Sequence, residues 1–170
     1  MTTLRFLFIA LAAILTAGCG YNLVGYGSSL PNHIKTIAIP TFKNSSIEPN
    51  IHRDVTDSIR RAFISDGRLK LIDARRADLI IKGTLIKYQL QPVSFSAQDT
   101  VDEYIVRLGV QIEAYDRIKK KLLFKQEFNP QWDYRVTSSV VDSESARNTA
   151  LIQAYNDLAD QLVSIIIDQF

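Results

Sequence analysis

The chain has 170 residues and carries 20 basic side chains (Lys and Arg) against 18 acidic ones, which gives a formal net charge of +2. So small a charge excludes a protein that binds nucleic acid through many phosphate contacts. One Cys and two His support neither an internal disulfide nor a zinc site. With 46% hydrophobic and 22% charged residues, the composition is typical of a single globular domain.

The N-terminal residues 1–18 have the layout of a signal peptide that is removed from the mature protein. Arg5 supplies the positive charge, and the apolar run at 6–15 spans only about half of a bilayer's hydrocarbon core as a helix. The next segment, Thr-Ala-Gly-Cys at 16–19, resembles the bacterial lipobox, in which the Cys receives lipid. We therefore predict a lipoprotein signal peptide over 1–18 and lipidation of Cys19. A free Cys behind an ordinary cleavage site is the alternative.

Residues 19–33 are predicted to be the lipidated Cys and a flexible tether, since four of the seven Gly lie between Gly18 and Gly27. Gly20, which is not Asp, resembles the pattern that sorts bacterial lipoproteins to the outer membrane. Residues 34–170 are predicted to form a single α+β domain.

The domain begins with a predicted β-branched strand at 34–40, followed by a loop and a helix over 49–66. One face of this helix is apolar. Its members are Ile51, Val55, Ile59, Ala62 and Phe63. Gly67 suits the position just beyond the helix end.

Alternating patterns predict further strands at 77–88, 103–115 and 122–134, with a short lead-in at 69–72. The loop 91–102 is predicted to be mobile, and a second loop covers 136–142. A long helix is expected over 143–169, capped by Asp142 or Ser143. Its apolar stripe contains Ala146, Ala150, Ala154, Leu158, Leu162, Ile165 and Ile166. The predicted fold is a two-layer α+β sandwich, with two helices on one mixed four-stranded sheet in the order β-α-β-β-β-α.

No residue pattern indicates catalysis, a metal or a cofactor. His33 and His52 have no motif partner, and the acidic cluster Asp99, Asp102 and Glu103 is typical of a solvated loop end. We predict that the protein is not an enzyme, and a lipid-anchored hydrolase remains as an alternative.

Two features suggest interaction surfaces. Lys119, Lys120 and Lys121 lie beside Arg117 at a predicted hairpin tip, where they form either a contact for anionic lipid phosphates or a solubilising turn. The second feature is an aromatic row of equal strand parity, Phe124, Phe128, Trp132 and Tyr134. We interpret its start as core, and its end as a rim where a partner docks.

Three segments carry a resemblance to a known family. They are 16–25 (Thr-Ala-Gly-Cys-Gly-Tyr-Asn-Leu-Val-Gly), 30–40 (Leu-Pro-Asn-His-Ile-Lys-Thr-Ile-Ala-Ile-Pro) and 77–85 (Ala-Asp-Leu-Ile-Ile-Lys-Gly-Thr-Leu). Together they resemble LptE, the lipopolysaccharide-assembly lipoprotein family. The resemblance implies a lipid anchor in the outer membrane and a domain on the periplasmic side or within the lumen of the LptD β-barrel. There it would act as plug and folding partner in lipopolysaccharide assembly.

The resemblance also implies lipopolysaccharide binding by basic residues near the two loops. Because neither loop contains Lys or Arg, the nearest candidates are Lys87, Arg107, Lys119, Lys120, Lys121 and Arg135. A different outer-membrane lipoprotein with a similar sandwich, which regulates a periplasmic synthase or pilots a secretion channel, is the alternative.

Overall fold

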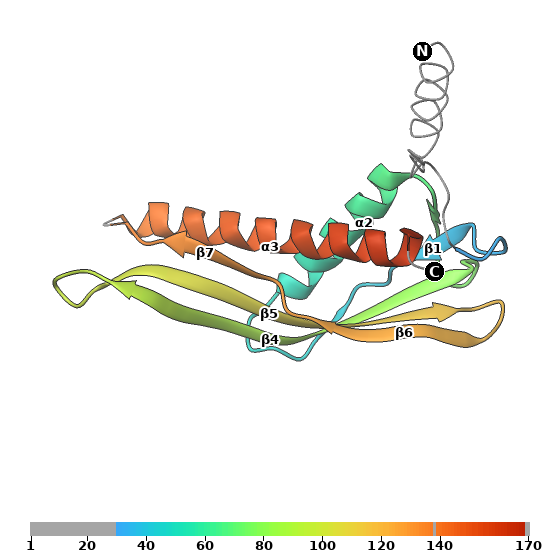
Figure 1. Ribbon diagram of the computed structural model, residues 1–170, viewed down its shortest axis with the longest axis horizontal. Helices are drawn as coiled ribbons and strands as arrows, with labels where there is room; N and C mark the ends of the chain where they lie inside the picture. The colour runs from blue at the N-terminus through green and yellow to red at the C-terminus, as the bar shows by residue number, and fades with distance from the viewer. Residues whose placement is uncertain (1–29, 138, 169–170) are drawn as a thin grey trace, which may run out of the picture.

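The computed structural model describes residues 30–137 and 139–168, so the predicted signal peptide, Cys19 and most of the tether lie outside the described residues. The described chain forms two helices and one mixed seven-stranded sheet, and both helices lie on the same side of the sheet (Figure 1). The α+β class and the two layers are therefore confirmed, whereas the predicted number of four strands is wrong.

The centre of the sheet is the antiparallel hairpin of β4 (Leu79–Phe95) and β5 (Val101–Asp116). Three short strands, β1 (Thr36–Ala38), β2 (Lys43–Asn44) and β3 (Lys70–Leu71), complete one side by parallel pairing: β1 and β2 with β4, and β3 with β1. β3 confirms the predicted short lead-in at 69–72, whereas β2 has only two residues and was not predicted.

On the other side of β5, the predicted strand 122–134 is divided at Asn129 and Pro130. It forms β6 (Lys121–Phe128) and β7 (Gln131–Arg135), which pair with different parts of β5. Because Pro has no backbone N–H to donate, it suits the break between two strands. Even so, the carbonyl of Pro130 accepts the N–H of Leu108 at 3.0 Å, so β5 keeps this backbone bond across the break.

The predicted loop 91–102 is mostly strand. β4 continues to Phe95, and only the turn at 96–100 interrupts the hairpin. Pro92 faces Tyr104 of β5 within this extension. In the described part of the chain no strand pairs with the outer edge of β4 beyond Leu85, and Pro is tolerated in such an edge strand.

The first helix, α2 (Ile51–Asp66), starts two residues later than predicted and ends at Gly67, whose φ of 73° is the left-handed conformation that favours Gly. The second helix, α3 (Val140–Asp168), starts three residues earlier than predicted. Its first turn is capped by Ser139, whose Oγ accepts the N–H of Asp142 at 3.2 Å, so the predicted caps Asp142 and Ser143 are wrong.

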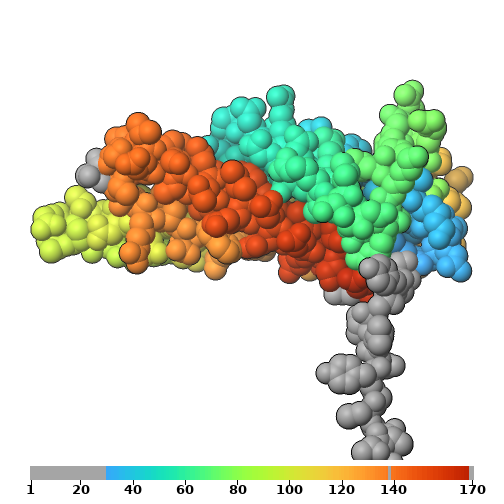
Figure 2. Space-filling view, turned by 90° about the horizontal axis from the view of Figure 1, so that it is seen from above, coloured from blue at the N-terminus to red at the C-terminus, as the bar shows by residue number. Residues whose placement is uncertain are grey.

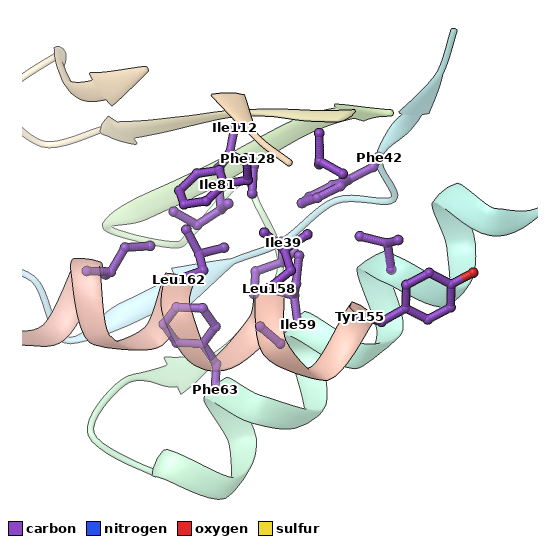
Figure 3. Close-up of a cluster of buried hydrophobic side chains, with 14 of the residues drawn as sticks. Ile39, Phe42, Ile59, Phe63, Ile81, Ile112, Phe128, Tyr155, Leu158 and Leu162 are labelled. Carbon is purple, nitrogen blue, oxygen red and sulfur yellow. The ribbon is translucent and has the colours of Figure 1, made fainter. Parts of the chain in front are cut away.

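The core lies between the sheet and the helices. The predicted faces are confirmed: Ile59 and Phe63 of α2 and Leu158 and Leu162 of α3 are fully buried. Figure 3 shows these side chains beneath those of the sheet. The sheet contributes Ile81, Ile112 and Phe128. Burying each such side chain contributes roughly 1.5–3 kcal/mol. Within residues 30–137 and 139–168, no helix lies over the second face of the sheet.

Candidate functional site

Three of the predicted basic residues lie on the sheet face that no helix covers. Val106 and Leu108 of β5 are buried under the helices, so Arg107 between them faces the other way. Residues directly opposite one another in a sheet share a face, and the register pairs Gln89 with Arg107 and Lys87 with Gly109. It also pairs Arg135 with Glu103, which lies four positions before Arg107 on β5 and therefore on the same face of the sheet. We call this surface, formed by Lys87, Arg107 and Arg135, the open basic face.

Arg107 is held by two glutamines. Its Nη1 donates to Gln91 Oε1 at 2.6 Å and its Nε donates to Gln131 Oε1 at 3.0 Å. No carboxylate among residues 30–137 and 139–168 pairs with it. The amides therefore orient the guanidinium without neutralising it. An oriented, uncompensated Arg is suited to bind a phosphate or carboxylate through two hydrogen bonds.

The other two residues have different surroundings. Lys87 is exposed and lies beside Gly109, where an added Cβ would come within 2.9 Å of the Lys87 Cβ. Gly109 therefore allows β4 and β5 to approach at the bulge next to Lys87. Arg135 faces the acidic Glu103 across the strands, which reduces the local positive charge.

Lys119, Lys120 and Lys121 do not belong to this surface. They lie in and next to the turn between β5 and β6, at the far end of β5 from Glu103. The turn is fixed by Asp116, which is 1% exposed and accepts the N–H of Lys119 at 2.9 Å. The structure therefore divides the predicted lipopolysaccharide-binding residues between two places.

His33 has a partner that sequence analysis missed. Its Nε2 lies 2.6 Å from Asp116 Oδ2, across 83 positions of the chain. Burial by itself would raise the pKa of Asp116, but hydrogen bonds from the Lys119 N–H and from His33 outweigh it and hold the pKa below its ordinary value. This contact fastens the beginning of the domain to the β5–β6 turn.

A second missed group surrounds Arg147 of α3. Its Nη2 donates to Glu144 at 2.6 Å, and its Nη1 donates to the Tyr88 hydroxyl at 2.7 Å and to Glu48 at 3.4 Å. The spacing of Glu144 and Arg147 is the only part visible in the sequence. Since these partners lie on α3, β4 and the loop before α2, the group joins the helix to the sheet.

The aromatic row lies on the face that the helices cover. Phe128 is buried, Phe124 and Trp132 pack against the core, and Tyr134 stacks on Tyr104 with ring centroids 5.8 Å apart. The predicted core role is confirmed for the start of the row. Trp132 and Tyr134 are also half-buried, so this row is chiefly a packing element.

The described residues contain no group of three or more His, Cys, Asp or Glu that is arranged to hold a metal. Asp99 and Asp102 are exposed at the β4–β5 turn and the start of β5, as expected of a solvated loop end. Over residues 30–137 and 139–168, no helix has both the length and the apolar character needed to cross a membrane.

These features define a class: a small α+β domain with helices on one face of a mixed sheet and an uncovered polar face that presents an unneutralised Arg. Comparison with known proteins gives the family. The model of the LptE family, described as lipopolysaccharide-assembly, matches residues 34–166. The chain belongs to this family, which confirms the resemblance in the sequence. Family membership supports an outer-membrane lipoprotein of lipopolysaccharide assembly, and the family is non-enzymatic.

Solved structures share the fold at low sequence identity. A Xanthomonas campestris protein of the family DUF330 has a TM-score of 0.59 at 12% identity, over 82% of this chain and 87% of that one. A minor lipoprotein from Acinetobacter baumannii has a TM-score of 0.52 at 15% identity, over 80% and 92%. The rare lipoprotein B from Shewanella oneidensis has a TM-score of 0.51 at 17% identity, over 72% and 90%. No curated protein matches the sequence.

Proposed function

We propose that the mature protein is anchored in the outer membrane by lipid on Cys19 and acts with an LptD-like β-barrel, as plug and folding partner, in lipopolysaccharide assembly. The observation that carries the proposal is the match to the LptE family over 34–166, which covers nearly the whole domain. The lipobox-like segment at 16–19 supports the anchor, which needs two or more acyl chains for stable attachment.

The partner is tested by purifying the lipidated protein from outer membranes with a mild detergent. We expect a large β-barrel in a one-to-one ratio. Recovery of a periplasmic synthase or a secretion channel in its place would contradict the proposal and favour the alternative lipoprotein functions.

The anchor is tested by Cys19→Ala. This change removes the thiol that would receive the lipid, so we expect an unprocessed precursor and loss of the protein from the outer-membrane fraction. Normal processing and fractionation of the variant would refute lipidation at this position.

Direct lipopolysaccharide binding is the finer part of the proposal, and we assign it to the open basic face. Arg107 is the central residue, because its guanidinium is oriented by Gln91 and Gln131 and lacks a carboxylate partner in the described chain. A hydrogen bond to a charged group contributes roughly 1.5–3 kcal/mol. Loss of this side chain is therefore expected to weaken binding by about 10- to 100-fold.

The matched pair of variants is Arg107→Gln and Arg53→Gln. Both remove one positive charge, but Arg53 is exposed on α2, in the helical layer. We expect Arg107→Gln alone to weaken binding of purified lipopolysaccharide. An equal effect of both variants would reduce the interaction to net charge and refute a site on the open face.

A further inference from the structure

One end of the molecule collects positive charge that the net charge of +2 conceals. Residues 33–36, 70–78 and 116–121 contain eight basic and three acidic side chains, and the remaining residues from 19 onward contain 11 basic and 15 acidic ones. Seven of the eight basic residues form no ion pair within the described chain. These seven, which we call the basic end, are Lys35, Lys70, Arg76, Arg117 and Lys119–Lys121.

Contacts of the fold bring these separate segments together. Lys70 lies opposite Thr36 in the parallel pairing of β1 and β3, next to Lys35. The Arg117 N–H donates to the Asp78 carbonyl at 2.8 Å, which joins the β5–β6 turn to the start of β4. Figures 1 and 2 both place the first described residues and the β5–β6 turn at one end of the molecule, opposite the β4–β5 turn.

The three acidic groups in these segments are already engaged. Asp73 forms an ion pair with Arg75 at 3.1 Å. Asp78 accepts hydrogen bonds from the Lys35 N–H and from both the N–H and the hydroxyl of Thr36, at 2.7–3.0 Å. Asp116 is buried and is bound by His33 and by the Lys119 N–H. The exposed ammonium groups of the lysine turn are therefore available to an external anion.

Apolar side chains flank the same turn. Ile118 is 50% exposed and Leu122 is 46% exposed, on either side of Lys119–Lys121. Exposed apolar side chains among cations are the combination that binds a membrane surface. The cations attract the anionic headgroups, and the apolar side chains insert at the boundary between headgroups and acyl chains. A solubilising turn does not need exposed Ile and Leu.

The position of the basic end fixes the surface that it can reach. The contact between His33 Nε2 and Asp116 Oδ2, at 2.6 Å, attaches the start of the domain to the β5–β6 turn. The fourteen residues from Cys19 to His33 span at most about 50 Å when fully extended. α3, whose 29 residues measure roughly 44 Å, extends away from this end toward the β4–β5 turn (Figure 1). Along the chain, the basic end is thus the first part of the domain that follows an anchor on Cys19.

We propose that the basic end docks on the anionic phospholipid headgroups of the leaflet that holds the anchor, with Lys119–Lys121 on the phosphates and Ile118 and Leu122 at the acyl boundary. Docked by this end, the domain has α3 extending away from the leaflet, with Arg107 and Arg135 of the open basic face toward the distal β4–β5 turn (Figure 1). This inference rests on the proposed function only through the lipid on Cys19.

A fluorescent label on the mature, lipidated full chain tests the docking. The lipid occupies the thiol of the only Cys, so that Leu122→Cys provides a single labelling site at the turn, and Ala97→Cys provides one at the opposite β4–β5 turn. Each labelled protein is reconstituted in vesicles of phosphatidylcholine, with or without phosphatidylglycerol, that contain a brominated lipid as quencher. We expect quenching of the Leu122→Cys label in phosphatidylglycerol vesicles alone, and no quenching of the Ala97→Cys label.

A matched pair of triple variants separates the turn from the total charge. Lys119→Gln, Lys120→Gln and Lys121→Gln together remove three charges from the turn, and Lys43→Gln, Arg61→Gln and Lys82→Gln remove three exposed charges elsewhere. We expect the first set to weaken docking roughly 100-fold and the second to leave it unchanged. High salt is expected to act like the first set, since it screens the lysines. Melting curves confirm that both proteins remain folded.

Three results would overturn the proposal. They are equal quenching in the neutral vesicles, equal behaviour of the two triple variants, and quenching only when lipopolysaccharide replaces phosphatidylglycerol, which would assign the turn to that lipid. Failure of the anchor is visible separately, because the parent protein would then take up the thiol label and would not float with phosphatidylcholine vesicles. In that case, flotation with phosphatidylglycerol vesicles that the turn variant abolishes still supports the basic end.

Discussion

In the core, the ring of Phe42 lies directly against the backbone of Gly83 of β4. A Cβ added at Gly83 would lie 2.5 Å from the Phe42 Cγ and closer still to two other ring carbons. Carbon atoms in favourable contact are about 3.5–4.0 Å apart. The ring must therefore move by about 1 Å or more in Gly83→Ala.

Phe42 cannot move freely. Its side chain is 3% exposed, and its backbone N–H donates to the Oγ1 of the fully buried Thr56 at 3.0 Å. An added methyl group in such a packed core costs typically 1–3 kcal/mol, from which about 0.5–1 kcal/mol is regained because Ala is less flexible than Gly in the unfolded chain. We expect Gly83→Ala to lower the free energy of unfolding by about 1–2 kcal/mol.

The assay is urea unfolding followed by the fluorescence of Trp132, the only Trp. A double-mutant cycle with Phe42→Leu isolates the contact, because Leu lacks the ring atoms that meet the new methyl group. In the Phe42→Leu background we expect Gly83→Ala to be neutral or stabilising. An equal loss of stability in both backgrounds would refute the steric explanation.

Two further predictions concern a helix cap and a buried carboxylate. Ser139→Ala removes the side chain that accepts the Asp142 N–H and is expected to cost about 1 kcal/mol in urea unfolding, while Ser139→Asp restores most of it; equal losses in both would exclude the cap. The pKa of Asp116 is lowered in the folded protein, so its ionised form stabilises the fold above the unfolded pKa of about 3.9, and this contribution disappears as the pH falls further. We therefore expect Asp116→Asn to be destabilising at pH 7 and to approach the parent protein in urea midpoint below about pH 4, whereas a constant difference would contradict the linkage.

Elements with strong local periodicity were predictable from the sequence. The alternation in β5 and the apolar faces of α2 and α3 depend on spacings of two and of three to four residues, which tertiary contacts left unchanged. The second half of β4 was not predictable in this way. Its polar residues and Pro92 favour a loop, and only pairing with β5, such as Gln91 with Ile105, makes it a strand.

The candidate sites show the same division. Successive side chains of a strand point to opposite faces of the sheet. The sequence of β5 alone therefore places Arg107 on the face opposite to the one that Val106 and Leu108 bury. The two glutamines that orient Arg107 are 16 and 24 positions away, and the partner of His33 is 83 positions away. Contacts at such separations depend on strand register, which no local pattern in this chain reports.

Charge gives the clearest case of what folding adds. The net charge of +2 disfavours a protein that covers many phosphates, yet it averages over a chain whose excess of basic residues lies at one end. Lys119–Lys121 are visible as a run, but Lys35 and Lys70 become neighbours only through the parallel pairing of β1 and β3. Salt screens the attraction between a protein charge and an anionic membrane beyond about 10 Å. The local arrangement of basic residues, and not the net charge of the chain, therefore determines whether the domain binds the membrane.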